Sequence, residues 1–458
     1  MRVVIIGLGE VGRELVRAFD EAGYDVVAID TNAKLVDSLK DRFEVDLRVG
    51  SGTDERLMDE VEAGSAELVI AVSNNDEANI VACHIAKYQG AAKVVARAQG
   101  EDYSSSVEGI RTDFLGIDLT VNPSVLVAQE LVNFARSHGA VEVLDLVRGR
   151  IDLVQVEVGG TSRTGRSYID TSISNIPVRE KGVLIAAIIR DGELIVPGGP
   201  DTLSEGDRLY LVGKRSSLRE AEDLFTARRE SRTKCIAGGG LTAETMAREL
   251  ARDGGRTLII ESDEARAKKL RELLPEESIV VATGDATDTS LLEELEVGRM
   301  DLFVAVTPSD EVNMMAALLA DRLGVPRTAA VVDRPEYLEV LRSLDIDMPV
   351  SARSTASRVI LRETLRRQGL FISRLEGKAE ILEYFVTERS RVAGKRLGDV
   401  RLPRHALACA IYRDKVVGEG QVFIPGGKDV FEEGDRVVML VRDDVVRDVS
   451  RLFGGVGA

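Results

Sequence analysis

The 458-residue chain repeats itself, and this duplication constrains its fold more than any other feature of the sequence. Four stretches recur in the same order after roughly 230 residues, too many for a chance match. They are VVIIGLGEVG (3–12) with KCIAGGGLTA (234–243), VGSGTD (49–54) with ATGDATD (282–288), LVIAVSNNDEANIVAC (68–83) with LFVAVTPSDEVNMMAA (302–317), and GELIVPGGPDTLSEGDRLYLVG (192–213) with GQVFIPGGKDVFEEGDRVVMLV (420–441). The chain is therefore a tandem duplication, long enough for several domains.

The first part of each copy alternates short apolar strands with helical segments. Val3–Ile6 and Asp25–Ile29 have the composition of buried strands, and the apolar residues between them recur at helical spacing. This alternation predicts a doubly wound parallel sheet, which is a Rossmann-like domain. Helical stretches at Pro123–Arg136 and Ser354–Arg367 follow. Each has an apolar stripe that fits either a neighbouring domain or the core of its own domain.

The second part of each copy has a different pattern. Residues 151–213 and 378–441 alternate apolar and polar side chains and contain PGG and EGD turns, which predicts small α+β lobes. The predicted fold class is α/β, with two tandem Rossmann-like parallel-sheet domains, each followed by a small α+β lobe. The predicted limits are 1–140, 141–228, 229–370 and 371–458, with a charged linker at Asp223–Arg232 between the copies.

The glycine-rich loop of the first copy predicts a nucleotide site. Gly7, Gly9 and Gly12 follow a strand and open a helix, a context that suits a tight turn, a close approach to a pyrophosphate, and close packing of helix on strand. The helix N-terminus would offer free N–H groups to the phosphates. Asp30 ends the second strand, where a carboxylate accepts hydrogen bonds from the adenosine ribose.

The second copy repeats the device with Gly238, Gly240 and Ala243, and Glu261 stands where the first copy has Asp30. The acidic residues that follow Glu261 would repel a 2′-phosphate, and no arginine stands beside Asp30. NADP is therefore disfavoured at both sites. Turn and packing roles alone are the alternative reading of the glycines.

Further ligand contacts are expected at other strand ends, because ligands bind at the carboxyl edge of an open parallel sheet. Arg97 is either a phosphate clamp or a surface ion-pairing residue. If Tyr103 and Tyr337 correspond, Val331 replaces Arg97 in the second copy, so the two sites differ. The full set of candidate contacts is Gly7, Leu8, Gly9, Glu10, Val11, Gly12, Asp30, Ser51, Gly52, Thr53, Ser73, Asn74 and Arg97 in the first copy, and Gly238, Gly239, Gly240, Leu241, Thr242, Glu261, Asp285, Ala286 and Thr307 in the second.

Composition excludes several classes of function. The formal charge of −17 argues against nucleic acid and against adhesion to anionic lipid. The three cysteines and three histidines have no metal-ligand spacing, so neither a metal site nor a catalytic residue is predicted. No apolar run is long enough to span a bilayer, and the N-terminus has no export signal, so a cytoplasmic location is expected.

The whole chain resembles the TrkA family of potassium-uptake regulators, which are built from tandem RCK (KTN) domains. The resemblance rests on IIGLGEVG with Asp30, on GDAT, on AVSNNDEAN with AVTPSDEVN, and on the order of the four domains. It implies that the chain binds NAD(H) and also ATP or ADP, and that it forms a homo-oligomer, from a dimer to a tetrameric ring. It also implies a Trk-type potassium-translocating membrane subunit (TrkH/TrkG-like) as partner, on the cytoplasmic face of the inner membrane. The first copy departs from the family pattern at GSGT, which puts an acidic contact at Ser51 in doubt.

The resulting hypothesis is a non-enzymatic regulator that gates a potassium transporter in response to nucleotide. Two alternatives remain open: an NAD-dependent oxidoreductase, and a nucleotide-binding scaffold with another partner. The lobes offer arginines, aspartates and glutamates in turns, and we expect these charges to be solvated.

Overall fold

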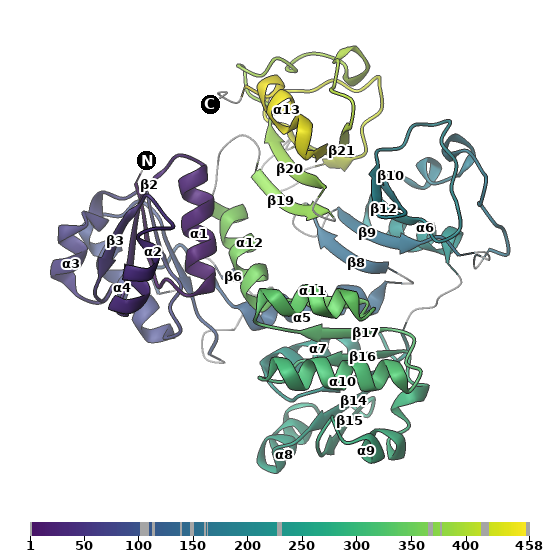
Figure 1. The fold of residues 1–458 in the computed structure, drawn as a ribbon, viewed down its shortest axis with the longest axis horizontal. Coiled ribbons are helices and arrows are strands. Elements are labelled where there is room, and N and C mark those ends of the chain that lie inside the picture. Colours follow the sequence, from purple (N-terminus) through teal and green to yellow (C-terminus); the bar gives the residue numbers. More distant parts are fainter. Residues whose placement is uncertain are drawn as a thin grey trace. The chain divides into compact units, whose positions relative to one another are not determined.

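The computed structural model describes residues 2–100, 110–111, 115–137, 140–146, 151–159, 162, 164–226, 231–364, 370–375, 378–413 and 421–454. The chain forms two compact units, each assembled from both copies (Figure 1). One unit combines Met1–Val132 with Arg232–Thr364, and the other combines Asn133–Ser231 with Leu365–Ala458. The two predicted Rossmann-like domains thus share one unit, and the two lobes share the other.

The first Rossmann-like domain is a parallel sheet with the strand order β3-β2-β1-β4-β5-β7, and the short β6 pairs antiparallel with β7. Helices lie in the connections between successive parallel strands, as the strand–helix alternation predicted. The elements are β1 (Arg2–Ile6), α1 (Glu10–Glu21), β2 (Asp25–Asp30), α2 (Ala33–Leu39), β3 (Asp46–Val49), α3 (Glu55–Glu60), β4 (Leu68–Ala71), α4 (Asp76–Gln89), β5 (Val94–Arg97), β6 (Ile110–Arg111), β7 (Leu119–Val121) and α5 (Pro123–Arg136).

The second Rossmann-like domain repeats this sheet with the order β15-β14-β13-β16-β17-β18, all parallel. Its central strands are apolar and buried on both faces, as expected of a covered parallel sheet. The elements are β13 (Thr233–Ala237), α7 (Leu241–Ala251), β14 (Arg256–Glu261), α8 (Glu264–Leu273), β15 (Ile279–Thr283), α9 (Thr289–Glu294), β16 (Leu302–Ala305), α10 (Asp310–Arg322), β17 (Thr328–Val331), α11 (Pro335–Ser343), β18 (Met348–Val350) and α12 (Ala352–Thr364).

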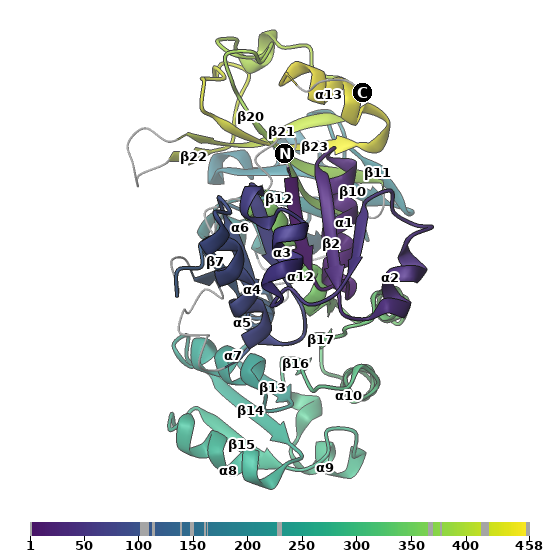
Figure 2. The ribbon, with the colours of Figure 1, turned by 90° about the vertical axis from the view of Figure 1, so that its left-hand side faces the viewer.

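The last helix of each Rossmann-like domain contacts the other domain. α12 lies along α1 of the first domain (Figures 1 and 2), and the Arg358 guanidinium pairs with the Glu130 carboxylate of α5 at 2.6 Å. In the reverse direction, the Ser124 carbonyl of α5 accepts a hydrogen bond from the Thr242 hydroxyl of α7 at 3.2 Å. Of the two placements that the sequence left open for these helices, the structure therefore has the crossed one. α12 also begins two residues before the predicted Ser354.

The second unit contains two lobes, each with a five-stranded antiparallel sheet, of orders β11-β10-β12-β9-β8 and β19-β20-β23-β21-β22. Apolar side chains of both sheets share one core, which includes Leu153, Tyr210, Ile381 and Leu440. The elements are β8 (Ala140–Asp145), β9 (Asp152–Glu157), β10 (Val183–Arg190), β11 (Glu193–Ile195), β12 (Arg208–Gly213), α6 (Arg215–Phe225), β19 (Leu370–Leu375), β20 (Ala379–Phe385), β21 (Ala406–Arg413), β22 (Gln421–Phe423), β23 (Arg436–Arg442) and α13 (Val446–Leu452).

The expectation that the charged residues of the EGD turns are solvated is wrong for their aspartates. Asp207 and Asp435 are buried, not solvated, and their carboxylates pair with Arg190 and Arg413, each at 2.7 Å. A buried carboxylate needs such a partner together with hydrogen bonds to its remaining oxygens, and the backbone amides of Ser204 and Glu432 supply them. These aspartates are structural residues that close the turn onto the sheet.

The charged stretch between the copies also begins differently from the prediction. Residues 223–225 belong to α6, because Leu224 and Phe225 are buried in the core of the first lobe. The fold class predicted from the sequence is confirmed, whereas the four domain limits stay predictions. Within the described residues, no helix combines the length and the apolar composition that crossing a membrane requires.

Candidate nucleotide-binding sites

Close packing within the first domain leaves no room for a side chain at two positions of the glycine loop. Gly7 has a φ of +96°, and a Cβ atom there would lie 2.7 Å from the Ser73 amide nitrogen. A Cβ at Gly12 would lie 1.8 Å from the Gly7 carbonyl oxygen. These two glycines are therefore required by the turn and by helix–strand contact, as the motif predicted.

Gly9 differs from Gly7 and Gly12 because the described residues leave open space around it. A Cβ at Gly9 would meet no atom within 4 Å, and its φ of −59° suits any residue. Gly240 repeats this at the second site, with open space and a φ of −70°. Neither packing nor backbone conformation requires a glycine here, and a glycine is what a close approach by a pyrophosphate would need.

The helices that follow the two glycine loops begin without a side-chain cap. α2, α3 and α4 start on Asn32, Asp54 and Asn75, whose side chains accept hydrogen bonds from the first turn. α1 and α7 start on Gly9 and Gly240, which offer no such acceptor. The first-turn N–H groups of α1 and α7 therefore lack a side-chain acceptor and remain available to an anion.

The predicted ribose carboxylates hold the glycine loops in place. One Asp30 oxygen accepts the Leu8 amide at 2.7 Å, and the other accepts the Asn32 amide at 2.8 Å. Glu261 does the same with Gly239 at 2.7 Å and Asp263 at 2.8 Å. A carboxylate oxygen has more than one acceptor site, so both side chains retain capacity for ribose hydroxyls.

The two loops compensate for the different lengths of these carboxylates. Glu261 is one methylene longer than Asp30, and the loop residue beside it is Gly239 where the first domain has Leu8. A Cβ at Gly239 would lie 2.5 Å from Leu270 Cδ1 and 2.6 Å from Glu261 Oε2. The larger carboxylate, together with Leu270, therefore favours the smaller loop residue.

A second compensation explains why GSGT replaces GDAT. A Cβ at Gly52 would lie 2.6 Å from the Ile6 side chain. The second domain has Ala286 at this place, opposite the smaller Ala237. The turns themselves match, because the Ser51 hydroxyl bonds to Thr53 as the Asp285 carboxylate bonds to Thr287.

A buried asparagine in each domain was not singled out by the sequence reasoning. Asn79 accepts hydrogen bonds from the Ser73 amide and hydroxyl, at 2.9 and 2.7 Å, and donates to the Ser73 and Arg97 carbonyls at 3.0 and 2.9 Å. Asn313 repeats this pattern with Thr307 and Val331. Each asparagine therefore fixes two strand ends at the crevice. The signal was present, since both residues stand at matching places in SNNDEAN and TPSDEVN.

Arg97 ends β5 at the first crevice, where Val331 ends β17 in the second. Tyr103, on which the sequence alignment relied, lies outside the described residues, but the hydrogen bonds of Asn79 and Asn313 establish the same equivalence. The Arg97 guanidinium donates to the Ser73 carbonyl at 3.2 Å and to Asn74 Oδ1 at 3.1 Å. These contacts are not those of a surface ion pair.

The second crevice has a cation of its own that the sequence did not reveal. The Arg266 Nε donates to the Gly239 carbonyl at 2.6 Å, and its Nη2 pairs with the Glu244 carboxylate at 3.1 Å. Leu35 occupies the corresponding place in the first domain. Arg266 thus binds the glycine loop through the Gly239 carbonyl, a contact that no local sequence pattern predicts.

The other candidate residues take positions at the same edges. Residues 51–53 follow β3, Ser73 and Asn74 follow β4, and Thr307 follows β16, all at carboxyl ends of parallel strands. The structure thus places the predicted residues of each copy at the carboxyl edge of one parallel sheet. Their contacts with a ligand stay predictions.

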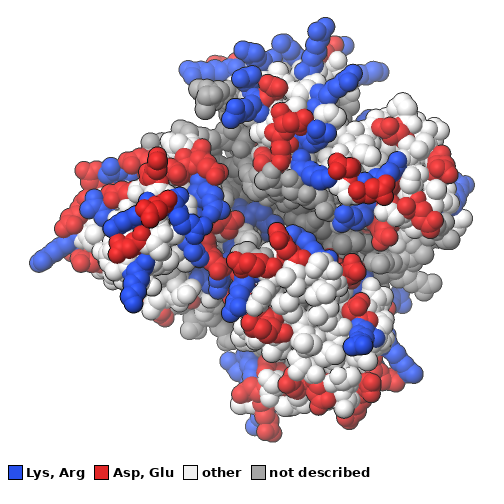
Figure 3. Space-filling model, in the orientation of Figure 1, with Lys and Arg blue, Asp and Glu red and all other residues white. Residues whose placement is uncertain are grey.

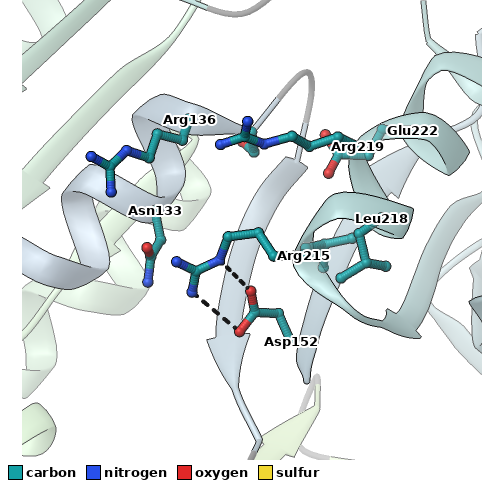
Figure 4. A pocket seen from close by; sticks show the side chains of 9 residues that line it. Asn133, Arg136, Asp152, Arg215, Leu218, Arg219 and Glu222 are labelled. Carbon is teal, nitrogen blue, oxygen red and sulfur yellow. Dashed lines mark hydrogen bonds and ion pairs between the residues drawn. The ribbon is translucent and has the colours of Figure 1, made fainter. Parts of the chain in front are cut away.

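Two cavities lie in the lobes. Figure 4 shows the smaller one, of about 20 Å³, where Arg215 pairs with Asp152 at 2.7 Å beside Arg136 and Arg219. It has room for about one water molecule. The larger, of about 330 Å³, is lined by the first PGG turn, by Ile173–Ile176 and by Leu407 of the other lobe.

Side chains that would support other chemistry are few. Burial raises the pKa of the Cys83 and Cys409 thiols to about 12 and that of Cys235 still further, so all three stay protonated at neutral pH. No metal-binding cluster of His, Cys, Asp and Glu occurs in the described part of the chain. Acidic and basic side chains are interspersed on the face shown in Figure 3.

Comparison with known proteins identifies the family. The TrkA-N domain family matches residues 3–123 and 235–352, and the TrkA-C domain family matches residues 163–226 and 381–454. The chain belongs to the TrkA family. The Trk system potassium uptake protein TrkA homolog 1 of Methanosarcina mazei is 32% identical over 464 residues, covering 99% of this chain and 100% of that protein. TrkA of Vibrio alginolyticus is 29% identical, covering 99% of this chain and 98% of its own.

The fold recurs in solved structures. The GsuK RCK domain aligns with a TM-score of 0.58 at 18% identity, covering 99% of this chain and 94% of that one. The GsuK channel bound to NAD aligns with a TM-score of 0.59 at 18% identity, covering 99% and 78%. This TrkA-family chain therefore has the tandem RCK architecture that the sequence resemblance implied.

Proposed function

We propose that this TrkA-family chain is the nucleotide-sensing regulatory subunit of a Trk-type potassium uptake system. It binds adenosine nucleotides at the two crevices and controls a potassium-translocating membrane subunit. The observation that carries the proposal is the pair Gly9 and Gly240, which are unexplained by the protein's own packing and stand at uncapped helix starts. The potassium uptake system in this proposal comes from the relatives of the chain, which are named Trk system potassium uptake proteins.

The ligands we propose are NAD(H) and ATP or ADP. Asp30 and Glu261 supply the ribose carboxylates, and the amides at the starts of α1 and α7 supply the phosphate contacts. The GsuK channel, which shares the fold, has been solved bound to NAD. The proposal includes all the candidate ligand contacts that the sequence predicted in the two copies, from Gly7 in the first copy to Thr307 in the second.

The proposed partner is a TrkH/TrkG-like subunit, contacted by a homo-oligomeric ring at the cytoplasmic face of the inner membrane. Nucleotide can shift the gate only through its different affinities for two states of the ring, and a coupling of about 1–3 kcal/mol would be typical. The chain regulates in this scheme and catalyses no reaction. The crossed contacts of α12 with α1 connect the first crevice to the second domain.

The test has two stages. Calorimetric titration of NADH, NAD, ATP and ADP onto wild type, Asp30→Ala and Glu261→Ala assigns ligands to sites. Loss of one charge-assisted hydrogen bond should weaken binding at the altered site by about 1.5–3 kcal/mol. Potassium flux into vesicles that carry the membrane partner then measures gating with and without each nucleotide. Saturable binding with a flux that ignores nucleotide would leave a scaffold, and turnover of a bound nicotinamide would instead indicate an oxidoreductase.

A further inference from the structure

Four charged side chains from both Rossmann-like domains gather at the first crevice. Arg353, in the first turn of α12, contacts the Glu10 carboxylate at the start of α1. Its other terminal nitrogen lies 3.2 Å from the Asp333 carboxylate, two residues beyond β17. Arg97 of β5 is close enough for the charges of both Asp333 and Arg353 to act on it. The second domain thus contributes an arginine to the crevice of the first.

Arg97 retains a donor that could serve a ligand. Its Nε is fully buried and has no hydrogen-bond partner among the described residues. Burial lowers the pKa of the Arg97 guanidinium and Arg353 adds to that effect, whereas Asp76 and Asp333 oppose it. Two guanidinium groups held near each other, one with an unused buried donor, favour the arrival of an anion.

Glu10 stands where that anion would be expected. It is the first residue of α1, beside the amides that face phosphates in a Rossmann-type site. Its carboxylate and a phosphate would repel each other and would compete for the same arginine. In the structure, Arg353 is shared between Glu10 and Asp333, and these pairs outweigh the effect of burial and raise its pKa.

The second crevice lacks this arrangement. Ser124 of α5 takes the place of Arg353, and its carbonyl accepts a hydrogen bond from Thr242 of α7. Leu241 replaces Glu10, and Val331 replaces Arg97. These three replacements remove the charged groups from the side of the predicted site where the phosphates would lie, so we expect them to affect the recognition of phosphates more than that of adenosine.

We propose that Arg353 is a phosphate-binding residue of the first nucleotide site, and that this site prefers adenosine nucleotides with a polyphosphate chain, such as ATP, to AMP. On binding, Arg353 exchanges the Glu10 carboxylate for the terminal phosphate, and Arg97 offers its buried donor to the same group. The inference rests on the proposed nucleotide site and adds its ligand class. Because Arg353 lies in the first turn of α12, the exchange acts directly on the helix that packs along α1.

The experiment measures dissociation constants of AMP, ADP and ATP for the full-length chain. Asp30→Ala in each background identifies the signal that belongs to the first site. Arg353→Gln should weaken ATP binding by roughly tenfold or more, the value of one charge-assisted hydrogen bond, and AMP binding by less than about threefold. Arg353→Lys should restore part of the ATP affinity, because it keeps the charge but not the planar fork.

Two further variants separate phosphate binding from a purely structural ion pair. Glu10→Gln breaks the same ion pair as Arg353→Gln but removes a competing carboxylate, so ATP should bind several-fold more tightly. Arg358→Gln is the matched control, since Arg358 also joins α12 to the first domain, through Glu130 at 2.6 Å. It should leave the difference between AMP and ATP unchanged.

The possible results distinguish a failure of this inference from a failure of the proposed function. If Glu10→Gln and Arg353→Gln weaken ATP alike, or if Arg358→Gln reproduces the effect, Arg353 only joins the domains and the inference is wrong. If wild type prefers ATP to AMP and Arg353→Gln preserves that preference, the inference is also wrong, although nucleotide binding stands. If wild type binds no nucleotide in an Asp30-dependent manner, the proposed function itself fails.

Discussion

The two Rossmann-like domains share a sheet and a loop geometry but differ in what surrounds the loop. Leu8 with Asp30 and Ile6 with Gly52 in the first domain become Gly239 with Glu261 and Ala237 with Ala286 in the second. In each pair one member is smaller and the other larger in the second domain than in the first. The charged residues, by contrast, differ between the two sites. Arg97 and Arg353 lie at the first site, whereas Arg266 binds the glycine loop of the second. Packing around the loop is therefore adjusted in both domains, whereas the charged groups near the loop are not kept.

The largest expected effect concerns the third position of the glycine motif, which is Gly12 in the first domain and Ala243 in the second. Gly12→Ala would place a Cβ 1.8 Å from the Gly7 carbonyl oxygen, a backbone atom that cannot move without opening the turn. We expect loss of nucleotide binding at the first site and destabilisation of several kcal/mol, about the upper range for a core clash. The measurements are thermal unfolding and calorimetry. Ala243→Gly, the reverse change in the second domain, is the control and should cost about 1 kcal/mol or less.

The buried asparagines test whether the two crevices are equally well fixed. Asn79→Ala would leave the Ser73 amide and the Ser73 and Arg97 carbonyls without their partner. We expect a loss of about 3 kcal/mol in unfolding free energy, because each stranded buried group costs about 1–3 kcal/mol and water can replace some bonds. Denaturant unfolding measures it, and Asn313→Ala should cost a similar amount. A loss below about 1 kcal/mol in either variant would contradict this role.

The size compensation at the second site can be broken and then repaired. Gly239→Ala would bring a Cβ to 2.6 Å from Glu261 Oε2, so it should destabilise by about 1–3 kcal/mol, as overpacking does. Adding Glu261→Asp should recover part of this loss, because the shorter carboxylate restores the arrangement of the first domain. A double-mutant cycle gives the coupling. Additive effects would mean that the two residues do not share a volume.

The smallest effect concerns Glu14 of α1, whose place in α7 is taken by Thr245. Burial raises the pKa of Glu14, although Ser357 and Arg358 of α12 oppose that shift. Ionisation therefore costs stability above its ordinary pKa, and the cost disappears as the pH falls through the raised pKa. Glu14→Gln should raise the thermal midpoint slightly at pH 7–8 and not at acidic pH. A lower midpoint at neutral pH would show that the contacts with α12 dominate.

The sequence predicted the geometry of the glycine loop well, because that geometry depends on local constraints. Gly7 and Gly12 act within a single strand–turn–helix unit and Asp30 ends the next strand, so their spacing and residue types were sufficient. It predicted less where a group is shared between distant segments. The buried EGD aspartates were expected in solvent because a turn motif gives no sign of the arginine across the sheet. Arg353 was missed altogether, since nothing near it in the chain connects it with Glu10.

The sequence by itself determined the duplication, the strand–helix order and the positions of both glycine loops, because repeats, periodicity and backbone restrictions are local properties of a chain. Only the tertiary structure decided that the last helix of each Rossmann-like domain crosses to its neighbour and that Arg353 joins the first crevice. That outcome depends on contacts between residues more than three hundred positions apart, such as Glu10 and Arg353, whose approach is set by the packing of whole helices. The same packing gives the two copies of one ancestral unit different charges at their ligand edges.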